Sequence, residues 1–137
     1  MKSVTVIAED RVALLADISY VLGMSNVNID SLNVEMIGGK AIITLSVKDP
    51  IKAKGILERN SYNTAELDAI MIKVTNHLSE MTNIQQKLSK AKVNVEKLAM
   101  ITSSATEGIF ALTVDKPRKA MKLLGDIALV NGDSAYG

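Results

Sequence analysis

Cysteine and tryptophan are absent from this 137-residue chain, and phenylalanine occurs once. Without cysteine the chain can form no disulfide scaffold, thiolate metal site or cysteine nucleophile. Aromatic residues make up only 3% of the sequence, which argues against RNA binding, because single-stranded nucleic acid is bound by stacking on aromatic side chains. His77 is the only histidine. This argues against acid–base catalysis, which uses histidine most often, and against a zinc site, which needs several nitrogen or sulfur ligands.

An excess of charge of one sign is also missing. The 16 Lys and Arg residues face 15 Asp and Glu residues, a formal net charge of +1, whereas a nucleic-acid binder needs a basic stripe. No apolar run approaches the ~18 residues of a membrane span, and the start, MKSVTVIAEDR, reaches acidic residues too early for a secretory signal. We therefore expect a cytoplasmic protein with no nucleic-acid or membrane partner, no metal and no cofactor.

Two copies of one unit fill the sequence. Val27-Asn28-Ile29 recurs 66 residues later as Val93-Asn94-Val95, and Pro50 recurs 67 residues later as Pro117. The additional residue of the second copy falls in a turn, where Gly38-Gly39 of the first copy aligns with a longer polar stretch. Turns absorb insertions most easily. The repeat predicts two domains, residues 1–66 and residues 67–137.

Each copy has the same order of hydrophobic periods. In the first copy, alternation over 4–8 predicts a strand, and the spacing from Leu14 to Leu22 predicts a helix. Gly38-Gly39 predicts a hairpin turn and Asp49-Pro50 the start of a second helix. A short strand over 62–66 completes the unit. The order predicts an α+β protein of two tandem ferredoxin-like βαββαβ units, each an antiparallel sheet with helices on one face.

One irregularity is expected in the second strand of each copy. The apolar alternation changes phase between Ile29 and Leu32, which predicts a β-bulge near Asp30-Ser31 and an equivalent one after Val95.

At this point the sequence resembles the ACT domain family, and more closely the small proteins made of two tandem ACT domains. The resemblance covers roughly residues 2 to 125 and is carried by three stretches: VTVIAEDRVALLADISYVL, SNVNIDSLNVEMIGGKAIITLSVKDPIKAKGIL, and IMIKVTNHLSEMTNIQQKL followed by AKVNVEKLAMI. It implies a regulatory, non-enzymatic protein that binds a small molecule, most often an amino acid, where two ACT domains meet. It also implies that a separate enzyme or regulator is controlled in trans.

The family's binding elements are the loop after the first strand and the start of the second strand. The loop pattern of the family is an acid or Asn, two variable residues, Gly, a variable residue and Leu. Ala13 and Ser79 stand at the two glycine positions. The implied ligand-binding residues are Asp10, Arg11, Val12, Ala13, Leu14, Asn28, Ile29, Asp30, Asn76, Ser79, Asn94 and Val95.

Elementary chemistry supports a site at the first loop. The amides of Val12 to Leu15 at a helix start can bind a carboxylate, while Asp10 and Asp30 can pair with an ammonium group. Asn28 and Asn94 can donate and accept hydrogen bonds. The alternative is that Asp10 only caps the helix and Asn28 only closes a turn.

The two loops are not expected to be equal. Ser79 adds a hydroxyl that can cap its own helix, and Glu80 repels a ligand carboxylate, whereas Leu14 is uncharged. We expect the first loop to bind a ligand better than the second. His77 is expected to be an exposed loop residue.

The sheet face opposite the helices is also apolar, because it carries Ile7, Ile42, Met71 and Ile109. This predicts a homodimer or higher homo-oligomer, since an exposed apolar patch marks an interface. The alternatives to a ligand sensor are a structural oligomerisation module with vestigial sites, an acylphosphatase-like enzyme on the same fold, and an RNA binder.

Overall fold

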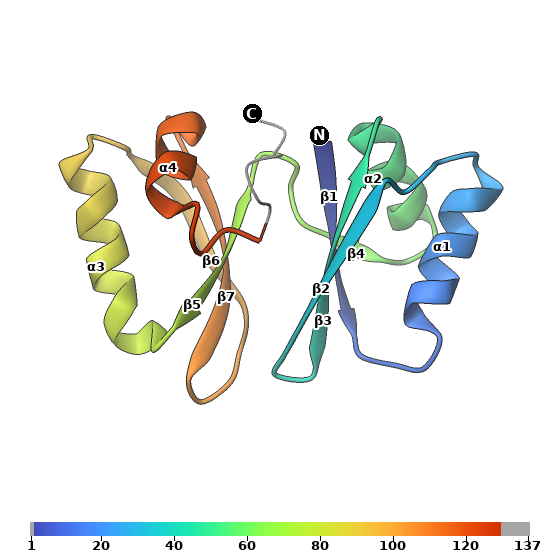
Figure 1. Ribbon diagram of the computed structural model, residues 1–137, viewed down its shortest axis with the longest axis horizontal. Helices are drawn as coiled ribbons and strands as arrows, with labels where there is room; N and C mark the ends of the chain where they lie inside the picture. The colour runs from blue at the N-terminus through green and yellow to red at the C-terminus, as the bar shows by residue number, and fades with distance from the viewer. Residues whose placement is uncertain (1, 130–137) are drawn as a thin grey trace. The chain divides into compact units, whose positions relative to one another are not determined.

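The computed structural model describes residues 2–129, and the chain divides between Leu67 and Asp68 into two compact units, called unit 1 and unit 2. Each unit has its own sheet, with both of its helices on one face of that sheet (Figure 1). This arrangement confirms the predicted α+β class and the antiparallel sheets covered by helices on one side.

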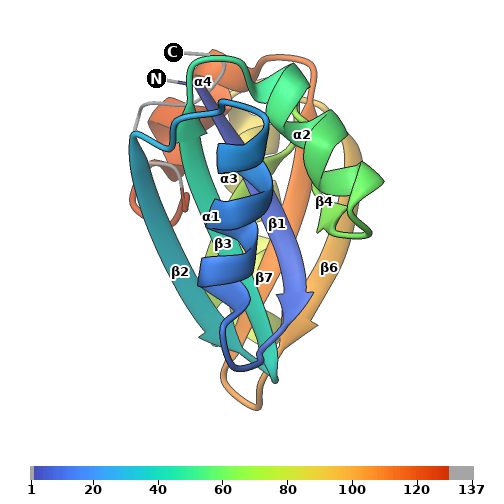
Figure 2. The same ribbon diagram turned by 90° about the vertical axis from the view of Figure 1, so that its right-hand side faces the viewer.

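Among the described residues, unit 1 contains four strands and two helices. They are β1 (Lys2–Glu9), α1 (Leu14–Met24), β2 (Ser31–Ile37), β3 (Lys40–Val47), α2 (Pro50–Arg59) and β4 (Asn63–Thr64). The strands pair antiparallel in the order β2-β3-β1-β4, and Figure 2 shows α1 and α2 in front of the sheet. The predicted fourth strand is present but only two residues long, and β2 forms one edge of the sheet.

Unit 2 contains three strands and two helices among the described residues. They are β5 (Ile70–Thr75), α3 (His77–Lys90), β6 (Val95–Ser103), β7 (Glu107–Val114) and α4 (Pro117–Leu124). The sheet order is β5-β7-β6. The fourth strand of the predicted pattern is reduced to an isolated bridge between Ile72 and Ala128, supported by a 2.8 Å hydrogen bond from the Lys73 amide to the Ile127 carbonyl.

Alternate residues of the strands build a separate hydrophobic core under the helices of each unit. In unit 1 the buried cluster includes Val4, Val6, Ile18, Leu22, Ile43, Leu45 and Leu57. In unit 2 it includes Ile70, Ile72, Val74, Leu88, Phe110, Leu112 and Leu124. Each fully buried Leu or Ile side chain contributes about 1.5–3 kcal/mol of transfer free energy.

Local signals place the turns and the second helix of unit 1. Gly38 and Gly39 have φ values of 61° and 78° in the two-residue turn between β2 and β3, a conformation that glycine adopts without strain. Asp49 caps α2, because its carboxylate accepts a hydrogen bond of 3.1 Å from the Lys52 amide. The predicted hairpin and helix start are both confirmed.

The predicted bulge is wrong for unit 1 and right for unit 2. Strand β2 begins at Ser31 and keeps a regular register with β3 to Ile37, so Val27 and Ile29 precede the strand instead of sharing it. In unit 2 the register of β6 shifts between Val95 and Lys97 and again after Met100. Alternation of apolar residues therefore marks burial here, whether or not the segment pairs as a strand.

The apolar sheet face opposite the helices does not have the expected exposure. Ile42, Met71 and Ile109 are at most 2% exposed in the single chain, and Ile7 is half-buried. The observation that motivated a homodimer is therefore not present at these residues, and oligomerisation stays a prediction. Within residues 2–129, no helix is long and apolar enough to cross a membrane.

Candidate functional site

A groove of about 360 Å³ opens in unit 1 between the first turn of α1 and the edge strand β2. We call it the α1 groove. It is lined by Asp10, Arg11, Ala13, Leu14, Leu15, Ala16, Val34, Met36, Ala41 and Ile43. Four of the sequence-predicted site residues, Asp10, Arg11, Ala13 and Leu14, are thus brought together, next to side chains of the second strand and its partner.

The backbone at the start of α1 leaves donors free for a ligand. Ala13 is the N-cap residue, and within residues 2–129 no side chain caps this helix. The first intrahelical bond runs from the Asp17 amide to the Ala13 carbonyl at 2.9 Å, so the preceding amides of Leu15 and Ala16 have no acceptor one turn back. Such amides carry partial positive charge and suit a carboxylate.

Ala13 itself has a left-handed backbone, with φ 64° and ψ 15°. This conformation is costly for a residue with a side chain and is free of cost for glycine. A glycine at this position would therefore remove a conformational cost, besides allowing the closer approach of a ligand to the backbone.

Arg11 turns back over unit 1 instead of reaching for a ligand. Its guanidinium donates to the Asp17 carboxylate at 2.7 Å and to the Tyr62 hydroxyl at 3.1 Å. The hydrogen bond to Asp17 raises the pKa of Arg11 above its ordinary value, so the side chain stays charged. Arg11 therefore fixes the loop to α1 and to the segment after α2.

Asp10 supplies an exposed acidic group at one end of the α1 groove. Its amide donates to the Gly39 carbonyl at 3.2 Å, which anchors the loop to the β2–β3 turn. The alternative that Asp10 caps α1 is wrong, since the cap is Ala13. A zwitterion placed here would have amides for its carboxylate, Asp10 for its ammonium group, and apolar walls for its side chain.

The remaining predicted residues of unit 1 lie outside the α1 groove. Val12 is 93% exposed, and Asn28, Ile29 and Asp30 do not line the groove. The Asp30 amide instead donates to the Ser46 carbonyl at 2.8 Å. The sequence analysis missed Val34 and Met36, although apolar residues that alternate along an edge strand would have indicated them.

Unit 2 has no corresponding loop, because only Asn76 separates the end of β5 at Thr75 from the start of α3 at His77. Asn76 has the left-handed φ of 54° and is the N-cap, while its amide donates to the Thr106 carbonyl at 2.6 Å. Asn76 thus repeats both the turn anchor of Asp10 and the backbone conformation of Ala13. The residues predicted as a loop form the first turn of a helix.

Ser79 does not have the predicted capping role. It lies inside α3, and its hydroxyl donates to the Asn76 carbonyl at 3.1 Å, so it accepts no amide of its own helix. Competition with a ligand carboxylate through this hydroxyl is therefore not the reason for a difference between the units. Glu80 does lie in the first turn of α3, where its charge opposes an incoming anion.

His77 is buried, so the prediction of an exposed loop residue is wrong. It is 8% exposed, its ring lies 6.2 Å from that of Phe110, and its Nδ1 has no hydrogen-bond partner among residues 2–129. A Cβ added at Gly108 would come within 2.8 Å of Phe110 Cε2 and 3.2 Å of His77 Cγ. Gly108 therefore makes room for both rings.

Asn94 and Val95 lie at the start of β6, on a different element from Asn76. The amide and side-chain nitrogens of Asn94 donate to the two oxygens of Asp115 at 2.8 and 3.1 Å, which fixes the start of β6. Val95 is 37% exposed on that edge strand. Asp115 is thereby occupied, and α4 has Lys116 as N-cap with no side-chain hydrogen bond.

No family model matches the chain, and no curated protein matches its sequence. Among solved structures it is similar to a protein of Bacteroides thetaiotaomicron, with 19% identity, TM-score 0.48, and 96% of this chain and 92% of that one covered. It is also similar to the regulatory subunit of aspartate kinase from Thermus thermophilus, with 13% identity, TM-score 0.42 and 90% of each chain covered.

A third similar structure is the small subunit of acetolactate synthase from Thermotoga maritima, with 13% identity, TM-score 0.39, and 93% of this chain and 89% of that one covered. At these identities and TM-scores the likenesses assign no function to this chain. Within residues 2–129, no group of three or more His, Asp or Glu side chains is arranged to hold a metal ion.

Proposed function

We propose that the protein binds an amino acid in the α1 groove and acts as a regulatory protein rather than as an enzyme. The observation that carries this proposal is the uncapped start of α1, with Asp10 beside it, in a groove whose other lining residues, apart from Arg11, are apolar. The amides of Leu15 and Ala16 would bind the carboxylate, and Asp10 would bind the ammonium group.

The walls of the groove favour a ligand with an aliphatic side chain. Val34, Met36 and Leu14 line it, and burying a methylene group against such walls contributes about 0.8 kcal/mol. A charged ligand side chain would lose its hydration there without gaining a partner. We therefore place leucine, valine, isoleucine and methionine before the charged amino acids as ligands.

Regulation would follow from differential affinity. A ligand that binds one arrangement of the protein better than another shifts the equilibrium between them, and a separate enzyme or regulator that contacts one arrangement senses the shift. The resemblance to ACT domains supports this role. The separate enzyme or regulator that would be controlled is part of the same proposal.

A thermal-shift screen of the twenty amino acids, followed by calorimetric titration, tests the proposal. A ligand at a hundred times its dissociation constant adds about 2.7 kcal/mol of stability. Met36→Asp should abolish binding of the aliphatic amino acids, because it places a charge in the groove. The matched control is Ile51→Asp in α2, where the side chain is 75% exposed and does not line the groove. The absence of a shift with any amino acid would overturn the proposal.

A homo-oligomer is favoured by a separate observation, the apolar side chains on the edge strands. Leu32 and Met36 on β2 are 41% and 52% exposed, and Leu98 and Met100 on β6 are 37% and 57% exposed. Pairing such edges between copies would cover these side chains. Light scattering should give a multiple of 14.7 kDa, reduced by Leu32→Lys or Leu98→Lys, and a monomer at micromolar concentration would contradict it.

A further inference from the structure

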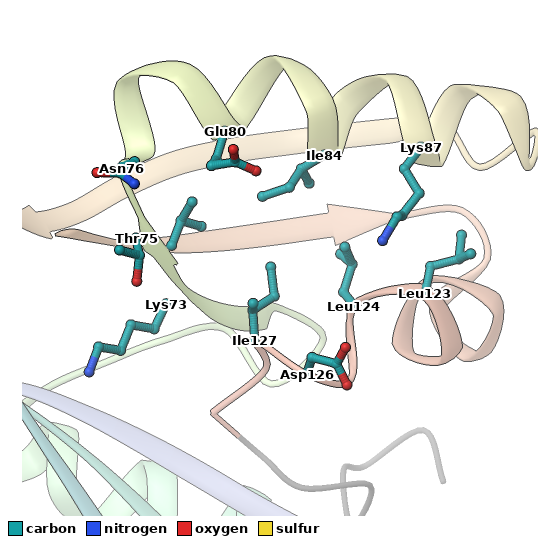
Figure 3. A pocket seen from close by; sticks show the side chains of 11 residues that line it. Lys73, Thr75, Asn76, Glu80, Ile84, Lys87, Leu123, Leu124, Asp126 and Ile127 are labelled. Carbon is teal, nitrogen blue, oxygen red and sulfur yellow. The ribbon is translucent and has the colours of Figure 1, made fainter. Parts of the chain in front are cut away.

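A second cavity lies wholly within unit 2, between α3, strand β5 and the residues that follow α4. Its volume is about 400 Å³, within the usual range of small-molecule sites. Figure 3 shows Glu80, Ile84 and Lys87 in a row along α3, with Leu124 and Ile127 opposite them and Asp126 farther from the helix. Charged groups thus stand towards both ends of the cavity, and aliphatic side chains line the space between them.

The repeat explains why unit 2 has this opening. In unit 1 the guanidinium of Arg11 spans from the β1–α1 loop to the hydroxyl of Tyr62, which follows α2. The residue 66 positions later is His77, whose ring is buried against Phe110. Because His77 turns inward, it cannot make the corresponding bridge to the segment after α4.

The charged side chains of the cavity differ in whether they already have a partner. Lys73, which also lines it, lies 3.3 Å from the Glu107 carboxylate. Lys87 and Asp126, in contrast, form no salt bridge within residues 2–129. Glu80 has only a long contact of 3.5 Å from the Asn83 side-chain amide. The available groups are therefore one cation and one anion at one end, and a second anion at the other.

We propose that this cavity binds a linear basic α-amino acid. Lys87 would bind the α-carboxylate, Asp126 the α-ammonium group and Glu80 the side-chain ammonium group. The aliphatic stem would lie along Ile84, Leu124 and Ile127. Glu80 and Lys87 are seven residues apart on α3, about 10.5 Å along the helix axis, so only a ligand with a linear stem and a charge at each end engages both.

Charge balance agrees with this assignment. Glu80, Lys87 and Asp126 together carry one net negative charge, and a basic amino acid carries one net positive charge. The α1 groove has one acidic side chain, Asp10, beside Arg11 and apolar residues, so it has no partner for a second ammonium group. The two sites therefore differ in ligand class, and this site does not depend on the function proposed for the α1 groove.

Titration with L-lysine as the probe, followed by amide chemical shifts and by calorimetry, tests the proposal. The shifts should map to α3 and the segment after α4. L-norleucine lacks the side-chain ammonium group and cadaverine lacks the carboxylate, so at this cavity, followed by the shifts of α3 and the segment after α4, each should bind about tenfold more weakly or worse, as expected for the loss of a charged hydrogen bond. Equal affinity for L-norleucine, or no shifts with L-lysine at millimolar concentration, would overturn the assignment.

Variants of the full chain separate the two sites. Glu80→Gln and Lys87→Met should each weaken L-lysine binding by about tenfold, and Lys87→Arg should retain it. The matched control is Lys90→Met, since Lys90 ends the same helix and does not line the cavity. Asp10→Ala should leave L-lysine affinity unchanged. If Lys87→Met, with an unchanged melting temperature, bound L-lysine as the wild type does, the proposal would fail.

Discussion

Unit 1 and unit 2 place equivalent residues in opposite environments where the first helix begins. Arg11 is exposed and hydrogen-bonded to Asp17 and Tyr62, whereas His77 is buried against Phe110. The accompanying strand position is Ala41 in unit 1 and Gly108 in unit 2. Where unit 1 has a four-residue loop, unit 2 has the first turn of a helix, and its inward ring is accommodated by a glycine.

The most disruptive way to test this pairing is Gly108→Ala. The new methyl group would clash with Phe110 and His77, and overpacking of a core costs about 1–3 kcal/mol. We expect a loss of that size in the free energy of unfolding, measured with urea. Ala41→Gly in unit 1, the matched control, should cost at most about 1 kcal/mol.

A second substitution tests whether Gly108 and His77 are coupled through packing. His77→Ala removes one of the two contacts, so the double variant His77→Ala/Gly108→Ala should lose less stability than the two single losses added together. Strict additivity would show that Gly108 and His77 are not coupled through packing.

Asp49 and Asp115 offer a second contrast between the units. Asp49→Ala removes the cap of α2 and should cost about 1 kcal/mol, with faster amide exchange in the first turn of that helix. Asp115→Ala removes the partner of Asn94, so faster exchange is expected at the start of β6 and not in α4. Faster exchange in α4 instead would mean that Asp115 caps it after all.

A smaller change in the free energy of unfolding is expected when the residues with left-handed backbone conformation, Ala13 and Asn76, are replaced by glycine. Ala13→Gly should raise the free energy of unfolding by about 0.5–1 kcal/mol, because it removes a strained conformation at the cost of some chain entropy. Asn76→Gly should change it by only a few tenths, since asparagine tolerates that conformation. Thermal unfolding of the two variants checks the difference, and a larger gain at Asn76 would contradict it.

The sequence predicted the architecture well for a physical reason. The hairpin at Gly38-Gly39 and the cap at Asp49 are local signals, and local chemistry is what a sequence states directly. The bulge near Asp30 was wrong because alternation reports burial and not strand pairing.

The candidate site was less predictable. Asp10, Ala13 and Leu14 line the α1 groove as the loop pattern indicated, but Val34 and Met36 enter it only because β2 is an edge strand. The inward position of His77 depends on Gly108, which is 31 residues away in the sequence. Contacts of that kind arise from tertiary packing and leave no local signal.

Calorimetric titration of L-leucine into the wild type, Asp10→Ala and Asn76→Ala tests most directly the claim that the α1 groove is a ligand site without a counterpart in unit 2. We predict one site per chain, an affinity at least about tenfold weaker in Asp10→Ala through loss of a charged hydrogen bond, and an unchanged affinity in Asn76→Ala. Two equal sites per chain, or equal losses in the two variants, would contradict the account.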